Sequence, residues 1–245
     1  MVRILKRRDP PLYVWRNMHL NKSRAILFFT LLVLAFLLFV MDRFPFASMG
    51  LILIPISYFL GVYAYKNYLL WMGGMEGEWL VNRVLEGLDD SFILLNNIVV
   101  PPNRGDTDHI VFGPSGIFVI ESKHYGGVIE CEGDEWSRYK VGRAGGVYGL
   151  SIGSPSNQAK RNAKVLKDLL LSHQYEAFPK GAPHLWVNAI LVFTNSNVKL
   201  NLRDERVPVV SADDLVGYIS SFDSERRFTA SEVDLMGDLV LKHST

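Results

Sequence analysis

The sequence predicts an α/β domain, built on a mixed sheet flanked by helices and preceded by a transmembrane helical hairpin. Two uncharged apolar runs near the amino terminus are each long enough to cross a bilayer as a helix. Residues 67–245 have the composition of a soluble domain and are numerous enough to bury one sizeable core. Within that domain, short apolar runs alternate with segments of helical periodicity, which is typical of a sheet covered by helices.

The amino-terminal segment, residues 1–24, is strongly basic although the whole chain is balanced, with Lys+Arg 26 against Asp+Glu 25. Asp9 is the acidic residue of this segment. Its basic residues are Arg3, Lys6, Arg7, Arg8, Arg16, Lys22 and Arg24. Such a segment is suited to contact with anionic lipid. The alternative is that it sets the orientation of the following spans and binds nothing.

The two apolar runs, residues 25–41 and 44–65, are separated by Asp42-Arg43 and predict a helical hairpin that crosses the membrane twice. The first reaches about 25 Å as a helix, and the second has slack for tilt around Pro55. A cleaved signal peptide is the alternative, but its charged region would be unusually long and a second span follows at once. Basic residues precede the first span and Lys66 follows the second, so both termini and the soluble domain are expected in the cytoplasm.

The soluble domain opens with a helix and a strand. From Gly77 an apolar stripe predicts a helix that ends near residues 87–90, and residues 92–100 predict the first strand. The strand leads into residues 104–127, where two apolar strands flank Gly-Pro-Ser-Gly and predict a hairpin.

The turn of this hairpin fixes its register. If Phe112 and Ile117 close the turn, Asp108 lies opposite Glu121. Side chains alternate between the faces of a strand, so Lys123 projects on the same side as Glu121. The sequence therefore predicts that two carboxylates and one ammonium converge.

Two carboxylates at directly opposed positions repel each other unless a cation neutralises them. Hard oxygen ligands without cysteine or a histidine pair suit Mg²⁺ or Mn²⁺, which also accept phosphate oxygens as ligands. Asp108 and Glu121 are therefore the expected metal ligands, and phosphodiester hydrolysis fits that chemistry. His109 and His124 are expected to have structural or polar-rim roles, because strand neighbours point to opposite faces.

The later residues predict further elements around this hairpin. Residues 128–132 and 136–141 bracket Gly133-Asp134 and predict a second hairpin that extends the sheet. Residues 142–153 are rich in glycine and predict a mobile loop, and their spacing matches no phosphate-cradling glycine motif. The single cysteine, Cys131, excludes an intrachain disulfide.

The carboxyl-terminal part alternates helices and strands. Residues 155–172 predict a helix with Ser154 as N-cap, and residues 185–194 and 207–211 predict buried strands in parallel with the sheet. A helix is expected from about residue 212. The last helix is expected over residues 231–242, introduced by a capping box of Thr229 and Glu232.

The predicted helix 155–172 carries a basic ridge. Lys160, Lys164 and Lys167 fall at i, i+4 and i+7, with Arg161 beside them. A solvated face is the ordinary interpretation of such a ridge, and a surface that contacts substrate phosphates is the alternative.

The Asp and Glu-Ser-Lys of the first hairpin resemble the PD-(D/E)xK nuclease signature, here without its Pro. The string GDTDHIVFGPSGIFVIESKHYGGVI resembles the nuclease-related domain called NERD. The likeness extends to Gly77-Glu78-Trp79, to Trp136 and to the helix opened by Ser154 to Gln158, and it is strongest over residues 74–202. The resemblance implies a fold similar to that of restriction endonucleases.

The resemblance also implies roles for individual residues. Asp108, Glu121 and Lys123 would be catalytic, with Lys123 steering the nucleophile or neutralising developing charge. Gln158 would orient substrate or water. Glu78 would help hold metal or orient water, or would only be a favourable charge at a helix amino end.

The function that follows is a membrane-anchored, Mg²⁺-dependent nuclease acting on DNA or RNA at the cytoplasmic face. One alternative is a membrane scaffold that keeps this fold and binds nucleic acid or a protein without cutting. The other is a structural membrane protein in which the acidic pair forms a rim salt bridge with Lys123.

Overall fold

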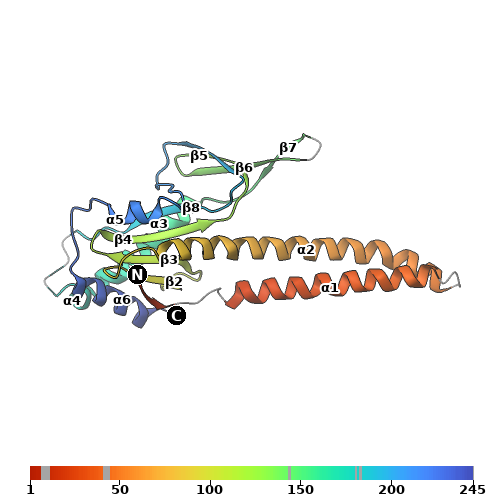
Figure 1. Ribbon diagram of the computed structural model, residues 1–245, viewed down its shortest axis with the longest axis horizontal. Coiled ribbons are helices and arrows are strands. Elements are labelled where there is room, and N and C mark those ends of the chain that lie inside the picture. Colours follow the sequence, from red (N-terminus) through yellow and green to blue (C-terminus); the bar gives the residue numbers. More distant parts are fainter. Residues whose placement is uncertain (7–11, 41–44, 143–144, 180, 182–183, 245) are drawn as a thin grey trace. The chain divides into compact units, whose positions relative to one another are not determined.

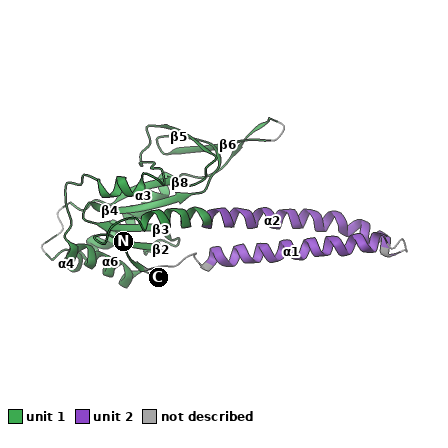
Figure 2. Cartoon of the chain, in the orientation of Figure 1, with its two compact units in different colours: residues 1–9, 76–245 green, residues 10–75 purple. Residues whose placement is uncertain are grey.

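The computed structural model describes residues 1–6, 12–40, 45–142, 145–179, 181 and 184–244. It forms two compact units, coloured separately in Figure 2. Residues 1–9 together with 76–245 make the first unit, and residues 10–75 make the second.

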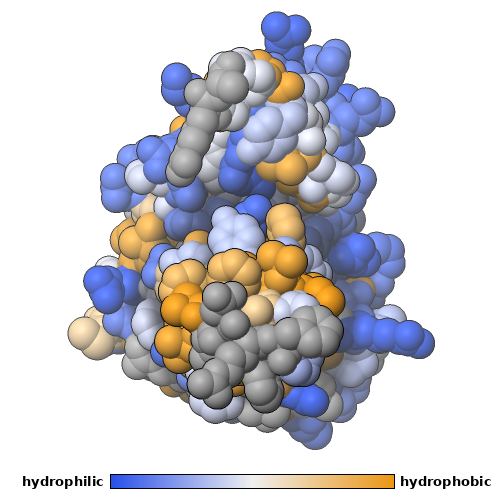
Figure 3. Space-filling view, turned by 90° about the vertical axis from the view of Figure 1, so that its right-hand side faces the viewer, coloured by the Kyte–Doolittle hydropathy of each residue, from blue (hydrophilic) through white to orange (hydrophobic). Residues whose placement is uncertain are grey.

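The second unit is a pair of apolar helices. Helix α1 (Leu12–Val40) belongs to it, and helix α2 (Phe46–Leu85) begins in it and continues into the first unit. Both helices are long and apolar enough to be candidate membrane spans, over Tyr13–Val40 and Ala47–Leu85. Both helices are longer than the predicted spans: α1 begins before residue 25, and α2 continues beyond residue 65. Figure 3 shows hydrophobic residues gathered at the end where the two helices connect.

Five strands form the main sheet of the first unit (Figure 1). Their order is β1 (Arg3–Lys6), β2 (Ile93–Ile98), β3 (Thr107–Gly113), β4 (Gly116–Lys123) and β8 (Asn188–Phe193). The inner pairs are antiparallel, whereas the outer pairs β1–β2 and β4–β8 are parallel. The parallel addition of the strand near residues 185–194 is therefore confirmed.

Strand β1 differs from the sequence prediction, in which residues 1–24 formed one basic segment. Arg3 pairs with Asp234 and donates from Nε to the carbonyl oxygen of Asp90 at 2.9 Å. Val2 is buried at 5% exposure in the same core as Leu94. The first residues therefore complete the folded unit that resumes after the hairpin.

Side chains of the main sheet alternate between two hydrophobic cores. Ile110 and Val119 face the core covered by α3 (Pro155–Ser172), α4 (Gln174–Ala177) and α6 (Ala230–His243). Val111 and Phe118 face the core that contains the end of α2 and α5 (Leu215–Ser220). Because both faces are covered, the strands are apolar throughout, and the predicted mixed sheet flanked by helices is confirmed.

The turn between β3 and β4 is flanked by Gly113 and Gly116. Residues pair as Phe112 with Ile117 and Gly113 with Gly116, which confirms the predicted register. A Cβ atom at Gly113 would lie 2.0 Å from the ring of Phe92, so only glycine fits. Ser115 is buried and donates from Oγ to the carbonyl oxygen of Ile219 at 2.6 Å.

A second sheet of four strands has the order β7 (Val147–Leu150), β6 (Glu135–Val141), β5 (Gly127–Glu132) and β9 (Val198–Arg203). The prediction that the β5–β6 hairpin extends the main sheet is therefore wrong. Within residues 142–153, the predicted loop contains strand β7, and residues 143–144 lie outside the described residues. Strand β9 was not expected, because its half-buried and exposed positions alternate and leave no continuous apolar run.

The helices after β7 agree more closely with the sequence. Ser154 Oγ accepts a hydrogen bond from the Asn157 amide at 3.2 Å at the start of α3, and Thr229 and Glu232 form the capping box of α6. Residues 207–211 make only an isolated bridge between Leu191 and Val209, not a full strand.

Candidate functional site

The candidate site lies where β3 begins and β4 ends, on the face covered by α3. Continuing the β3–β4 register by one residue beyond His109 and Ile120 places Asp108 opposite Glu121. Lys123 is the last residue of β4. The three side chains that the sequence singled out are thus brought together by one hairpin.

Glu121 is the most buried member of the group. Its side chain is 1% exposed, and Oε1 accepts a hydrogen bond from Lys123 Nζ at 2.6 Å. Oε2 lies at the longer distance of 3.5 Å from Nδ2 of Asn162 on α3. The carboxylate is therefore enclosed between its own strand and the helix above it.

Asp108 is held by the strand next to it. Its Oδ2 accepts hydrogen bonds from the backbone amide of Ser122 at 2.8 Å and from the Ser122 hydroxyl at 3.0 Å. Both bonds use the same oxygen, so the carboxylate is fixed in orientation through Oδ2. Ser122 is thus the residue that positions Asp108, and its place inside the Glu-Ser-Lys triplet gave no hint of that role.

Helix α3 contributes amide side chains to the site. Gln158 Oε1 accepts a hydrogen bond from Lys123 Nζ at 3.2 Å, which brings the predicted Gln158 into the group. Asn162 lies one turn further along the helix, is 4% exposed, and accepts at Oδ1 from Asn103 Nδ2 at 3.0 Å. Sequence reasoning missed Asn162, although its spacing of four residues from Gln158 places both on one helix face.

The electrostatics of the site favour an added cation. Burial, together with the charge of the Asp108 carboxylate, raises the pKa of Glu121 to about 8, and Lys123 only partly opposes this rise. Burial also raises the pKa of Asp108, against the influence of Lys123 and the Ser122 hydrogen bonds. Burial lowers the pKa of Lys123, but Glu121 and Asp108 outweigh it and raise the pKa above its ordinary value.

These shifts predict how the stability of the metal-free protein depends on pH. Between about pH 4.5 and about pH 8 the folded state holds a proton on Glu121 that the unfolded state has lost. The contribution of Glu121 to stability is therefore fully present below this window and is lost as pH rises through it, and the loss is on the order of a few kcal/mol. Thermal unfolding in EDTA should show the midpoint falling across the window, and Glu121→Gln should flatten the fall. The exposed control Glu135→Gln should keep the wild-type slope; an unchanged slope in Glu121→Gln would contradict the assignment.

Glu78 lies on the part of α2 that belongs to the first unit and is half-buried. The preceding residue, Gly77, packs so closely that an added Cβ would lie 2.6 Å from Thr194 Oγ1 and 3.0 Å from His124 Cβ. This turn of α2 therefore lies against the ends of β4 and β8. Its role toward metal or water stays a prediction.

The basic ridge lies on a different flank of α3. A helix turns about 100° per residue, so Lys160 and Lys167 are about 200° and 180° from Gln158. Lys160 pairs with Asp134 and Lys164 with Asp168, each at 2.5 Å. Arg161 is exposed. The structure thus does not bring the ridge together with the carboxylates.

Both histidines contact polar side chains. His109 Nδ1 lies 2.8 Å from Asn96 Oδ1, and Asn96 in turn donates to Asn82 Oδ1 at 2.7 Å. The ring nitrogens of His124 lie 3.0 Å from Thr194 Oγ1 and 3.1 Å from Asn195 Nδ2. These contacts agree with the expected structural roles.

Among the described residues, no group of three or more His, Cys, Asp or Glu side chains is placed to hold a metal ion. A pair of carboxylates nevertheless fits Mg²⁺ or Mn²⁺, which retain several waters and take the remaining ligands from substrate phosphate. Burial is the main cause of the raised pKa of Glu121 and the Asp108 carboxylate adds to it; such an ion would neutralise the charge of the two carboxylates.

Comparison with known proteins adds an independent observation. An uncharacterized protein of Bacillus anthracis is 42% identical over 83 residues, a match that covers 32% of this chain and 39% of that protein. The chain therefore spans well under half the length of this relative. No solved structure matches. Residues 73–194 match the family model described as the nuclease-related domain, NERD, and they include every strand of the candidate site. The chain thus carries a nuclease-related domain of the NERD family.

Proposed function

We propose that this protein is a membrane-anchored, metal-dependent nuclease that hydrolyses phosphodiester bonds of DNA or RNA. The observation that carries the proposal is the convergence of Asp108, Glu121 and Lys123 at the end of one hairpin, with Gln158 of α3 bonded to Lys123. This arrangement resembles the PD-(D/E)xK signature, and it lies inside the nuclease-related domain.

Asp108 and Glu121 would hold Mg²⁺ or Mn²⁺, which supplies a polarised phosphate and a water of lowered pKa. Ser122 keeps Asp108 oriented for this task through two hydrogen bonds. Lys123 presents an ammonium whose pKa is raised, so it stays charged and can neutralise charge that develops on the phosphate. Gln158 positions that ammonium from above the sheet.

The competing function is a scaffold that binds without cutting. The 2.6 Å bond between Lys123 and Glu121 favours it, because a lysine that already neutralises a buried glutamate is also what a purely structural site contains. A nuclease would cleave an added nucleic acid, whereas a scaffold would bind it without cleaving it.

The direct test uses the purified full chain in detergent, because a fragment that begins after the hairpin would lack strand β1. Single- and double-stranded DNA and RNA are incubated with Mg²⁺, with Mn²⁺ or with EDTA. We expect metal-dependent cleavage of at least one of these substrates. Binding without cleavage in every metal condition would favour the scaffold.

We infer membrane anchorage from the two exposed apolar helices, whose candidate windows are mostly unburied. Strand β1 precedes α1, yet it pairs with β2, which follows α2. Both ends of the hairpin thus connect to one folded unit, so a bilayer crossed by the hairpin has both ends on one side. The basic residues near the first span support the cytoplasm as that side.

This topology predicts the outcome of protease digestion. Protease added outside intact cells should leave residues 67–245 uncut, and permeabilised cells should lose them. Digestion of this domain in intact cells would reverse the orientation.

A further inference from the structure

We propose that the outer flank of α3 is a second nucleic-acid contact, a groove that binds a single strand by stacking a base on Trp186. Phosphates of that strand are bound by Lys164, Lys167 and Arg206. The inference rests on the proposed function in that both concern nucleic acid, but it uses none of the residues of the candidate site.

Trp186 is unusual for its size and position. It is 70% exposed although tryptophan is mostly buried in folded proteins, and it stands just before β8. The ammonium of Lys167 lies 5.2 Å from the centre of its ring. An exposed indole beside a lysine offers a stacking face and a charge to the same ligand.

One cavity beside Trp186 is cationic and apolar. Its volume is about 470 Å³, and it lies between α3, the start of β8, the segment at Pro208, and α5. The described residues that line it include Lys160, Lys164, Lys167 and Arg206 but no Asp or Glu. The pairs of Lys160 and Lys164 with aspartates are at least partly exposed, so a phosphate can replace the carboxylates at small cost.

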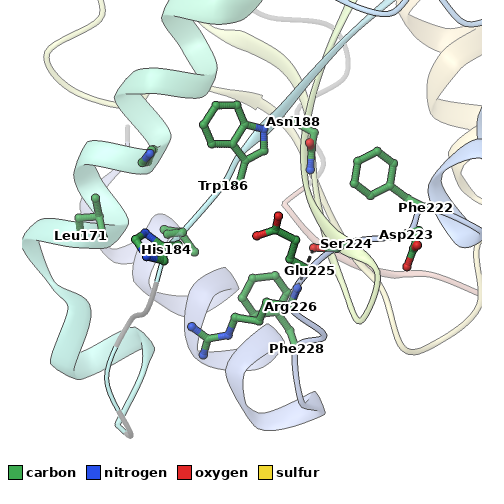
Figure 4. Close-up of a pocket in the computed structure, with 12 residues that line it drawn as sticks. Leu171, His184, Trp186, Asn188, Phe222, Asp223, Ser224, Glu225, Arg226 and Phe228 are labelled. Atoms are coloured by element: carbon green, nitrogen blue, oxygen red, sulfur yellow. Dashed lines mark hydrogen bonds between the residues drawn. The ribbon is translucent and has the colours of Figure 1, made fainter.

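A second cavity, of about 660 Å³, shares Trp186 and Lys167 with the first, but its lining adds carboxylates as well as Arg226. Asp223 and Glu225 line it, and Figure 4 shows the Glu225 carboxylate directed toward Trp186. Carboxylates repel phosphate but accept hydrogen bonds from the exocyclic amines of bases. The two cavities thus assign the base to the Glu225 side and the phosphates to the α3 side.

These features select a single strand over a duplex or a lipid headgroup. An indole stacks only on a base that is free of its neighbours, which a paired helix does not offer. A headgroup would use the cations but would gain nothing from the aromatic face beside a carboxylate. Because the groove and Gln158 lie on opposite flanks of α3, strand binding here is separable from chemistry at Glu121.

The test measures binding alone. The full chain carrying Glu121→Gln is purified in detergent with EDTA, so that nothing is cut, and a short fluorescein-labelled DNA strand of mixed sequence is titrated by anisotropy. Trp186→Ala should weaken binding about 10-fold, and Trp186→Phe should retain most of it. Joint Lys164→Gln and Lys167→Gln should weaken binding and reduce its salt dependence.

Two exposed residues elsewhere in the domain serve as matched controls. Tyr175→Ala removes an aromatic ring that is 79% exposed, and Lys199→Gln removes a lysine from the exposed side of β9. Neither should change the affinity.

Unchanged binding of the single strand by Trp186→Ala would overturn the proposal. It would also be overturned if duplex DNA bound as tightly as the single strand and depended on Trp186 to the same degree. Binding to phosphatidylglycerol vesicles that is tighter than binding to the strand and equally dependent on Trp186 would assign the groove to lipid instead. Failure of the nuclease assay is a separate result. If the protein binds a strand through Trp186 but never cleaves it, the proposed groove stands and the proposed catalytic function does not.

Discussion

Glu121→Gln and Asp108→Asn should each lower Mg²⁺-dependent cleavage by at least about 100-fold. Each change replaces an anionic ligand by a neutral amide of the same shape, so we also expect Mg²⁺ affinity to fall at least about 10-fold. Lys123→Met should lose turnover to a similar degree but largely keep the metal, because Lys123 is no ligand. Calorimetric titration of Mn²⁺ beside the cleavage assay separates the two effects.

Matched substitutions at exposed positions control for charge alone. Glu135→Gln, Asp213→Asn and Lys199→Met remove the same groups from exposed sites and should leave both measurements unchanged. If the acidic pair and Lys123 form only a structural salt bridge, the opposite result is expected. Removing Lys123 would then leave two facing carboxylates and reduce stability without any effect on cutting.

Val2→Asp should destabilise the folded unit by about 3 kcal/mol, because it places a carboxylate in a core where the valine is 5% exposed. For a domain of this size that corresponds to a fall of roughly 10 °C in the thermal midpoint. The reason lies in β1, which pairs with β2 and is tied by Arg3 to Asp234.

The control for this prediction is Val147→Asp, the same substitution on β7 at a valine that is 67% exposed. It should change the midpoint little. Equal midpoints for wild type and Val2→Asp would show that β1 does not belong to the folded unit, and would remove the topological argument that rests on it.

The sequence was sufficient where the determinants are local. Apolar alternation and a glycine-flanked turn fix the register that sets Asp108 beside Glu121, and Ser154 and Thr229 mark helix starts by capping. These features depend on neighbours a few residues apart, so a pattern in the chain records them.

Long-range pairing was not visible in the same way. Strand β1 is four residues long and pairs with Ile93 and its neighbours, which follow the helical hairpin in the sequence. Its arginine and lysine also look like the basic residues that set the orientation of a membrane span. Strand β9 alternates polar and apolar residues and depends on β5 for its place. The groove at Trp186 is likewise assembled from α3, β8 and α5, which no single segment of sequence reveals.

The central claim is that Asp108, Glu121 and Lys123 form one metal-dependent hydrolytic site. The most direct measurement is the single-turnover rate of nucleic-acid cleavage as Mg²⁺ is raised, for wild type and Glu121→Gln purified side by side in detergent. We expect a rate that rises with Mg²⁺ and saturates in the wild type and stays near background in the variant. Equal, Mg²⁺-dependent rates in the two proteins would contradict the claim.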